Sequence, residues 1–113
     1  MPFAWGTNDC VLFTADCVLA TTGVDHAQEL RGYRTAIQAS RLVKMLGGLE
    51  AIVTRRLGAA IPLHEVTAGD VVLVAIESAN ALGVYSGNAC LGPGKAGIIA
   101  VGRTQIIAAW KVK

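Results

Sequence analysis

The sequence predicts one α+β domain over residues 1–113, with N-terminal helices packed on a C-terminal antiparallel sheet of about four to five strands. At 113 residues the chain has the length of one compact domain with one core. Hydrophobic residues make up 53% and charged residues 16% of it, so the chain can bury a core and intrinsic disorder is excluded. Apolar residues follow a helical spacing in the first half, whereas closely spaced β-branched runs without βα alternation fill the second half.

The first helix is predicted from Cys10 to Ala20. Thr7-Asn8-Asp9 precedes it with side chains that accept hydrogen bonds from the free N–H groups of a helix start, and Thr21-Thr22-Gly23 ends it. Apolar residues nearly encircle this segment. That pattern predicts a central helix surrounded by other elements.

Two further helices are predicted before Pro62. Thr35 caps the second, which is amphipathic and ends at Gly47-Gly48. The third runs from Leu49 to Leu57, with Arg55 and Arg56 on its solvent side. The apolar residues of the second helix recur at i, i+3, i+4 and i+7, at Ala39, Leu42, Val43 and Leu46.

Four apolar runs in the second half are interpreted as strands. The segment Gly92-Pro93-Gly94-Lys95 is interpreted as a turn between strands, because it lacks the Gly-Lys-Ser or Gly-Lys-Thr ending of a phosphate-binding loop. We expect the sheet to be antiparallel, with the first helix on one face. The candidate strands are Val71–Ile76, Leu82–Tyr85, Gly97–Val101 and Gln105–Trp110.

Charge and hydropathy exclude several functional classes. The net charge is +2 without a basic cluster, so no nucleic-acid partner is expected. The longest charge-free stretch, 78–94, is interrupted by Gly, Asn and Pro, so no membrane-spanning segment is expected. Met1–Trp5 lacks the basic start and apolar core of a signal peptide. We therefore expect synthesis in the cytoplasm, with all three thiols reduced.

Cys10 is the principal candidate for chemistry, because it begins the first helix. The positive end of a helix dipole and its unpaired N–H groups stabilise a thiolate, so we expect the pKa of Cys10 to be lowered. The same N–H groups can hold an oxyanion. The alternative interpretation is a small apolar side chain at a buried helix start.

Three short motifs surround this cysteine and resemble the NlpC-type papain-like cell-wall cysteine peptidases. They are Trp5-Gly6-x-x-Asp9-Cys10, Ala68-Gly69-Asp70 entering an apolar strand, and Leu82-Gly83-Val84-Tyr85-x-Gly87. The resemblance implies a papain-like fold with Cys10 as the nucleophile. More closely, the chain resembles a small family encoded among phage and prophage tail genes. The additional segments that carry this likeness are Thr22-Gly23-Val24-Asp25, Arg31-Gly32-Tyr33 and Ala109-Trp110-Lys111-Val112.

The general base of those peptidases is missing from the expected place. Their later strand reads His-Val-Gly-Ile-Tyr, and its histidine deprotonates the nucleophile. Here Ala81 occupies that position. His26 and His64 are the candidate substitutes, although a loop imidazole without catalytic work is the alternative for both. Asp9 is expected to cap the helix and Asp70 to order a turn.

The sequence therefore favours a phage or prophage tail-tip or tail-assembly structural protein with a degenerate papain-like fold. Its expected location is the virion tail, and its expected partners are other tail proteins, such as hub or distal tail components, with peptidoglycan as a further candidate. The alternative is an active cysteine endopeptidase or amidase that cleaves peptidoglycan peptides during phage entry, with Cys10 as nucleophile. No cofactor or metal is expected.

A second alternative is a metal-binding virion component that uses Cys10, Cys17 and Cys90. Seven residues separate Cys10 from Cys17, so their α-carbons lie roughly 10 Å apart on a helix, which is beyond the reach of a disulfide. Cys17 is therefore expected to pack in the core, whereas Cys90 can approach Cys10 in space.

Overall fold

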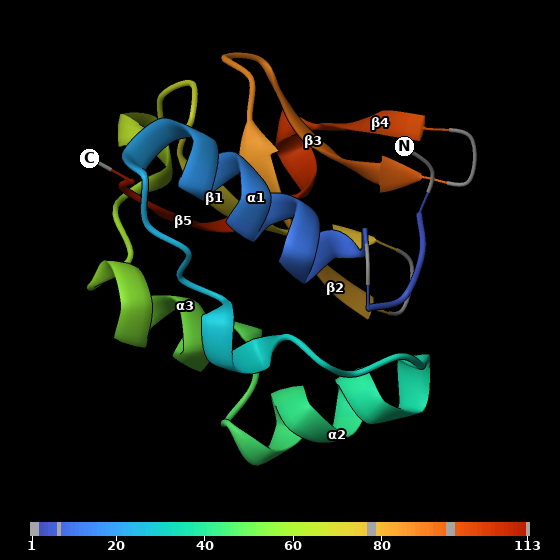
Figure 1. Cartoon of the computed structure of the whole chain (residues 1–113). Helices are drawn as coiled ribbons and strands as arrows, with labels where there is room; N and C mark the ends of the chain where they lie inside the picture. Colours follow the sequence, from blue (N-terminus) through green and yellow to red (C-terminus); the bar gives the residue numbers. More distant parts are fainter. Residues whose placement is uncertain (1–2, 7, 77–78, 95–96, 113) are drawn as a thin grey trace.

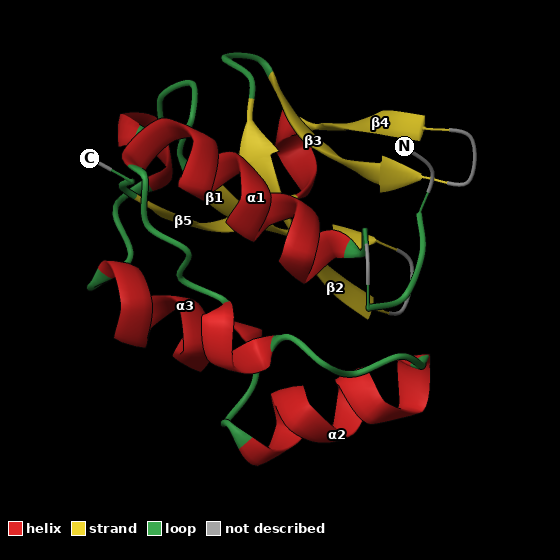
Figure 2. Ribbon diagram, viewed as in Figure 1, coloured by secondary structure: helices red, strands yellow, loops and turns green. Residues whose placement is uncertain are grey.

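The computed structural model describes residues 3–6, 8–76, 79–94 and 97–112. Within these ranges the chain is α+β, with three α-helices beside one antiparallel sheet (Figure 1, Figure 2). This confirms the predicted class. The helices are α1 (Cys10–Thr22), α2 (Ala36–Met45) and α3 (Leu49–Leu57), and the strands are β1 (Val71–Ile76), β2 (Ala79–Tyr85), β3 (Ala89–Gly94), β4 (Gly97–Gly102) and β5 (Ile106–Trp110).

Helix α1 begins at the predicted residue, Cys10, and ends at Thr22, two residues after the predicted Ala20. Asp9 caps its start, and Gly23, at φ 79°, ends it by donating its N–H to the Leu19 carbonyl at 2.8 Å. The expectation that other elements surround α1 holds only for its buried side. Val18 packs with β1 and with Val53 of α3, whereas Leu19 on the other side of the helix is 39% exposed.

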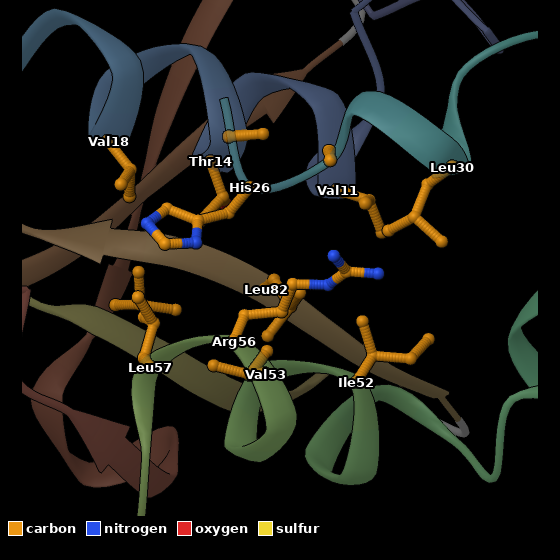
Figure 3. Close-up of a pocket in the computed structure, with 13 residues that line it drawn as sticks. Val11, Thr14, Val18, His26, Leu30, Ile52, Val53, Arg56, Leu57 and Leu82 are labelled. Atoms are coloured by element: carbon orange, nitrogen blue, oxygen red, sulfur yellow. The ribbon is translucent and has the colours of Figure 1, made fainter. Parts of the chain in front are cut away.

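Helices α2 and α3 confirm the predicted boundaries. Thr35 caps α2 by accepting the N–H of Gln38 at 3.2 Å. The prediction that both arginines of α3 lie on the solvent side is half wrong. Arg55 is exposed, whereas Arg56 turns between α1 and α3 (Figure 3). None of the described helices is long and apolar enough to cross a membrane.

The five strands run in the order β4-β3-β2-β1-β5. β1 is buried on both faces, since each residue of 71–74 is at most 2% exposed. One face packs on the helices through Val18 of α1 and Val53 of α3. Side chains on the other face of β1 pack against residues of the neighbouring strands, namely Tyr85 of β2, Cys90 of β3 and Ile106 of β5. The continuous apolar run of β1 therefore reflects two separate layers of the core.

The interpretation of 92–95 as a turn is wrong for its described part. Residues 92–94 pair with 97–99 as the end of β3, while Lys95 lies outside the described residues. Pro93 is tolerated because the β2 pairing of β3 covers only Cys90 and Leu91. No ladder hydrogen bond then requires the missing N–H of Pro93. β2 also begins at Ala79, three residues before the predicted Leu82.

Candidate functional site

The residue before Cys10 is a buried carboxylate that fixes the start of α1. Asp9 is 1% exposed and accepts hydrogen bonds from three of the described residues. The donors are the N–H of Leu12 at 3.0 Å, the N–H of Gly6 at 3.0 Å and the hydroxyl of Tyr33 at 2.5 Å. Burial and the Asp9 contact raise the pKa of Tyr33, so its hydroxyl remains a donor. The Trp-Gly-x-x-Asp motif and the Arg-Gly-Tyr segment thus form one structural unit.

Gly6 allows that unit to close. Its φ is +78°, and a Cβ at this position would lie 2.1 Å from the carbonyl oxygen of Tyr33. Any side chain there would collide with backbone and adopt a left-handed conformation that L-residues avoid. Trp5 beside it is 44% exposed and packs edge to face on Phe3, with ring centroids 4.9 Å apart.

Arg31 supplies a second support on the surface of α1. Its guanidinium donates to Asp16 at 2.8 Å and to Asp25 at 3.0 Å. The hydrogen bond from Arg31 holds the pKa of Asp25 below its usual value. Asp25 and Arg31 belong to two of the three segments that carry the resemblance to the tail-gene family. Their role in this structure is to tie the segment after α1 back onto the helix.

Cys10, at the start of α1, lines two separate hollows. The larger, about 290 Å³, lies between α1 and α2 and is lined by Trp5, Tyr33, Ser40 and Asn80 among mostly apolar side chains. The smaller, about 40 Å³, lies toward the sheet and is lined by Ala81, Leu82, Cys90, Ile99 and Val101, among others. Cys10 therefore lies between a larger cleft on one side and a smaller, mostly apolar hollow on the other.

The pKa of Cys10 is raised above the ordinary thiol value, so the expectation of a lowered pKa is wrong. Burial is the largest cause, and the charge of Asp9 acts in the same direction. Hydrogen bonds from backbone N–H groups, the strongest from Leu82 on β2, lower the pKa but do not outweigh burial. The helix start alone therefore does not activate this sulfur, because desolvation opposes the thiolate.

Neither histidine contributes to the two hollows that Cys10 lines. Ala81 lines the smaller hollow with Cys10, so a methyl group occupies the place where the resemblance expects the base. His26 instead lines a pocket between α1 and α3, where Figure 3 shows its ring beside Val18 and Leu57. The side chain of His64 is 82% exposed, and its Nε2 lies 3.8 Å from the Glu65 carboxylate.

The three cysteines do not form one site. Cys90 is buried beside Cys10 in the smaller hollow, and burial together with the Cys10 charge raises its pKa to about 11. Cys17 is only half-buried on α1, although core packing was expected. Among the described residues, which include all three cysteines, no group of three or more His, Cys, Asp or Glu side chains could hold a metal ion. The three-cysteine metal site is therefore not assembled.

The Gly-Asp motif orders the entry into β1. Asp70 is 4% exposed and accepts hydrogen bonds from the N–H of Thr67 at 3.0 Å and the Nζ of Lys111 at 3.1 Å. Burial alone would raise the pKa of Asp70, but these bonds and one from the N–H of Val112 lower it overall. Gly69, at φ +95°, donates its N–H to the Tyr85 carbonyl at 2.8 Å. Both residues are structural.

The later strand motif brings β2 and β3 close together. A Cβ on Gly83 would lie 2.2 Å from the sulfur of Cys90 and 2.6 Å from the carbonyl oxygen of Leu91. Tyr85 is 2% exposed and accepts a hydrogen bond from Arg103 at 2.5 Å. Glycine and tyrosine at these positions are thus explained by packing.

Sequence reasoning missed Tyr33 as the partner of Asp9. The two residues are 24 positions apart, and no local pattern links them. The signal present in the sequence is the Arg31-Gly32-Tyr33 segment, whose pattern does not by itself indicate a contact with Asp9. A buried capping carboxylate commonly needs a further donor, and a tyrosine in a neighbouring loop is a suitable one.

Comparison with known proteins adds one finding. The chain matches the family model described as Domain of unknown function (DUF6950) over residues 1–112. It matches no curated protein and no solved structure. Because the family match covers almost the whole sequence, the chain belongs to the DUF6950 family.

Proposed function

We propose that this chain is a structural component of a phage or prophage tail, at the tail tip or in tail assembly, and that it acts by contact with other tail proteins. The observation that supports a role without hydrolysis is that the hollow beside Cys10 is mostly apolar. Ala81, Leu82 and Cys90 line the hollow on its sheet side, and neither histidine lies there. The tail assignment rests on the sequence resemblance alone.

We further propose that the domain has the papain-like NlpC-type fold. The support is the placement of a cysteine at the start of a helix that packs on an antiparallel sheet, with β2 opposite the cysteine. A Gly-Asp turn precedes β1, as in the resemblance. In this proposal the domain retains the frame of the peptidases and lacks their base.

Two effects on Cys10 reduce hydrolytic capacity in the same direction. General-base catalysis typically contributes about 10²- to 10⁴-fold, and no described imidazole lies in either hollow of Cys10. The raised pKa of Cys10 further reduces the thiolate fraction at neutral pH. A thiol with neither a base nor a lowered pKa is a poor nucleophile.

Complementation in a phage or prophage that encodes this chain tests the proposal. The gene is deleted and replaced by the wild type, by Cys10→Ala or by the matched control Cys17→Ala. We expect the deletion to abolish infectious particles, and both variants to restore them and to be recovered in purified tails by quantitative mass spectrometry. Absence of the wild-type chain from purified tails would refute the tail role. Loss of infectivity specific to Cys10→Ala, with the protein still present, would refute the non-hydrolytic role.

The second candidate function is a cysteine endopeptidase or amidase that cleaves peptidoglycan peptides. It is favoured by the cleft of about 290 Å³ that opens at Cys10 and by the backbone N–H groups near its sulfur. This function requires a base from another chain. Purified protein incubated with peptidoglycan, alone and with purified tails that lack this chain, separates the candidates by mass spectrometry of released peptides. Cleavage that depends on Cys10 would support the peptidase.

A further inference from the structure

The two edges of the sheet differ in how they are protected. At the β5 edge, the N–H of Ile61 donates to the carbonyl of Ala109 at 2.8 Å and forms an antiparallel bridge. At the other edge, β4 pairs with β3 on one side, and no described segment pairs with its outer side. Figure 1 shows the β3-β4 hairpin at the margin of the molecule.

β4 also lacks the side chains that usually keep such an edge from pairing. Gly97–Gly102 contains no charged residue and no proline. Ile98 is 62% exposed and Ile99 is 47% exposed, and successive residues of a strand face opposite sides of the sheet. Natural edge strands are commonly blunted by lysine, proline or a bulge. β4 is instead apolar on both faces and regular along its pairing with β3.

The hydrogen-bond alternation of the hairpin shows which backbone groups face outward. The N–H of Ser86 donates to the carbonyl of Ala89 at 2.8 Å, so the next residue, Cys90, directs its backbone groups toward β4. Cys90 is opposite Val101. Val101 therefore directs its backbone N–H and C=O toward β3, and so does Ile99, two residues earlier. Because this direction alternates along a strand, the residues next to them direct their backbone groups away from β3. These outward-facing residues are Ile98, Ala100 and Gly102.

We propose that the outer edge of β4 pairs in antiparallel fashion with β4 of a second copy of this chain. The outward-facing residues place Ala100 opposite Ala100 of the second copy, on the two-fold axis. Ile98 then lies opposite Gly102 of the second copy, so a large side chain meets a small one. No charges face each other, and because the β5 edge is bridged by Ile61, pairing closes at a dimer and does not continue into a filament.

Strand pairing of this length buries less than the roughly 1,200 Å² of a standard protein interface. We therefore expect a dimer that dissociates on dilution. Sedimentation velocity over a wide concentration range tests it with Ile98→Lys and the matched control Ile107→Lys. Ile107 is an isoleucine on the opposite edge strand, 48% exposed. Circular dichroism establishes that both variants fold.

The wild type and Ile107→Lys should shift from monomer to dimer as concentration rises, whereas Ile98→Lys should remain a monomer. The lysine at position 98 of each copy places a charge at the paired edge, which opposes strand pairing. A wild type that is monomeric at every concentration overturns the proposal. So does a folded Ile107→Lys variant that loses dimerisation as fully as Ile98→Lys.

Cross-linking tests the register. Directly opposed, hydrogen-bonded residues have α-carbons about 5.5 Å apart, within the usual disulfide range of about 4.4 to 6.8 Å. In a Cys17→Ala background, Ala100→Cys should give a covalent dimer with diamide, which accepts two protons and two electrons as the S–S bond forms. Ile107→Cys in the same background should remain monomeric. Absence of the Ala100→Cys dimer, or equal cross-linking from Ile107→Cys, contradicts the register.

Discussion

Asp9 and Cys10 are neighbours in the sequence with opposite surroundings. Three donors hold the buried Asp9 carboxylate. The sulfur of Cys10 receives backbone N–H groups, but burial outweighs them and raises its pKa. The polar partners at this helix start thus serve the fold, while the group expected to do chemistry is desolvated. A motif can therefore retain its structural residues without an activated nucleophile.

The same contrast holds on the strand side. Asp70, Gly83 and Tyr85 are each explained by hydrogen bonds or close packing. Ala81 is the position that the resemblance assigns to catalysis, and it lines the hollow of Cys10 with a methyl group. Residues that carry a family likeness can thus specify architecture while the reacting groups differ.

Asp9→Ala is expected to have the largest effect on stability. It removes a cap and leaves the buried N–H of Leu12 and the partly buried donors of Gly6 and Tyr33 without their acceptor, which should cost about 3 kcal/mol. Asp16→Ala, the control, removes an exposed ion-pair partner and should cost about 0.5 kcal/mol. Urea unfolding followed by circular dichroism measures both. Equal losses would mean that Asp9 is not the support of this helix start.

Gly6→Ala should have the next largest effect and lower the free energy of unfolding by about 2 to 3 kcal/mol. It places a side chain on a left-handed backbone and brings its Cβ into collision with the carbonyl oxygen of Tyr33. The control is Gly23→Ala, which has nearly the same φ of +79° but no atom within 4 Å of the added Cβ. We expect about 1 kcal/mol for this control. Thermal or urea unfolding gives the difference, and a Gly6→Ala cost no larger than that of Gly23→Ala would disprove the close approach to Tyr33.

Ala81→His would place an imidazole in the smaller hollow that Cys10 lines. A nearby imidazolium lowers a thiol pKa, and one unit raises the thiolate fraction about tenfold. We expect the alkylation rate of Cys10 at neutral pH to rise by about that factor. Ala59→His, in the exposed loop after α3, should leave the rate unchanged. No difference between the two variants would mean that position 81 does not face the sulfur.

Asp70→Asn should have the smallest effect on the free energy of unfolding, and only at pH values above the range in which Asp70 titrates. Its folded pKa is lowered, so its stabilisation is complete above the unfolded value of about 3.9 and is lost as pH falls through the folded pKa. Asp70→Asn should cost about 1 kcal/mol at neutral pH and progressively less below the unfolded pKa. Urea unfolding at several pH values gives this profile. A cost that stays constant into acid would contradict the lowered pKa.

Local sequence patterns predicted most of the secondary structure. Val71–Ile76 was predicted with the observed bounds, because a continuous β-branched run bounded by turn residues is a strong strand signal. Thr35 and Asp9 were recognised as caps for a similarly local reason. β3 was missed because Gly92-Pro93-Gly94 resembles a turn, and its place in the sheet depends on where β2 pairing stops.

The properties of the site were less predictable, since they depend on contacts between distant segments. The raised pKa of Cys10 arises from burial in the folded chain, which the helix position alone does not reveal. Arg56 was expected in solvent, but its side chain lies between two helices. The partnership of Asp9 with Tyr33 joins segments that only the tertiary fold brings together.

The most direct test of a non-activated cysteine is the pH dependence of Cys10 alkylation. Cys17→Ala, Cys90→Ala protein leaves one thiol to react, and the rate follows its thiolate fraction. We predict a midpoint at or above the free-cysteine value of about 8.5, because burial and Asp9 both oppose the thiolate. A midpoint well below that value would contradict the account and make Cys10 a usable nucleophile.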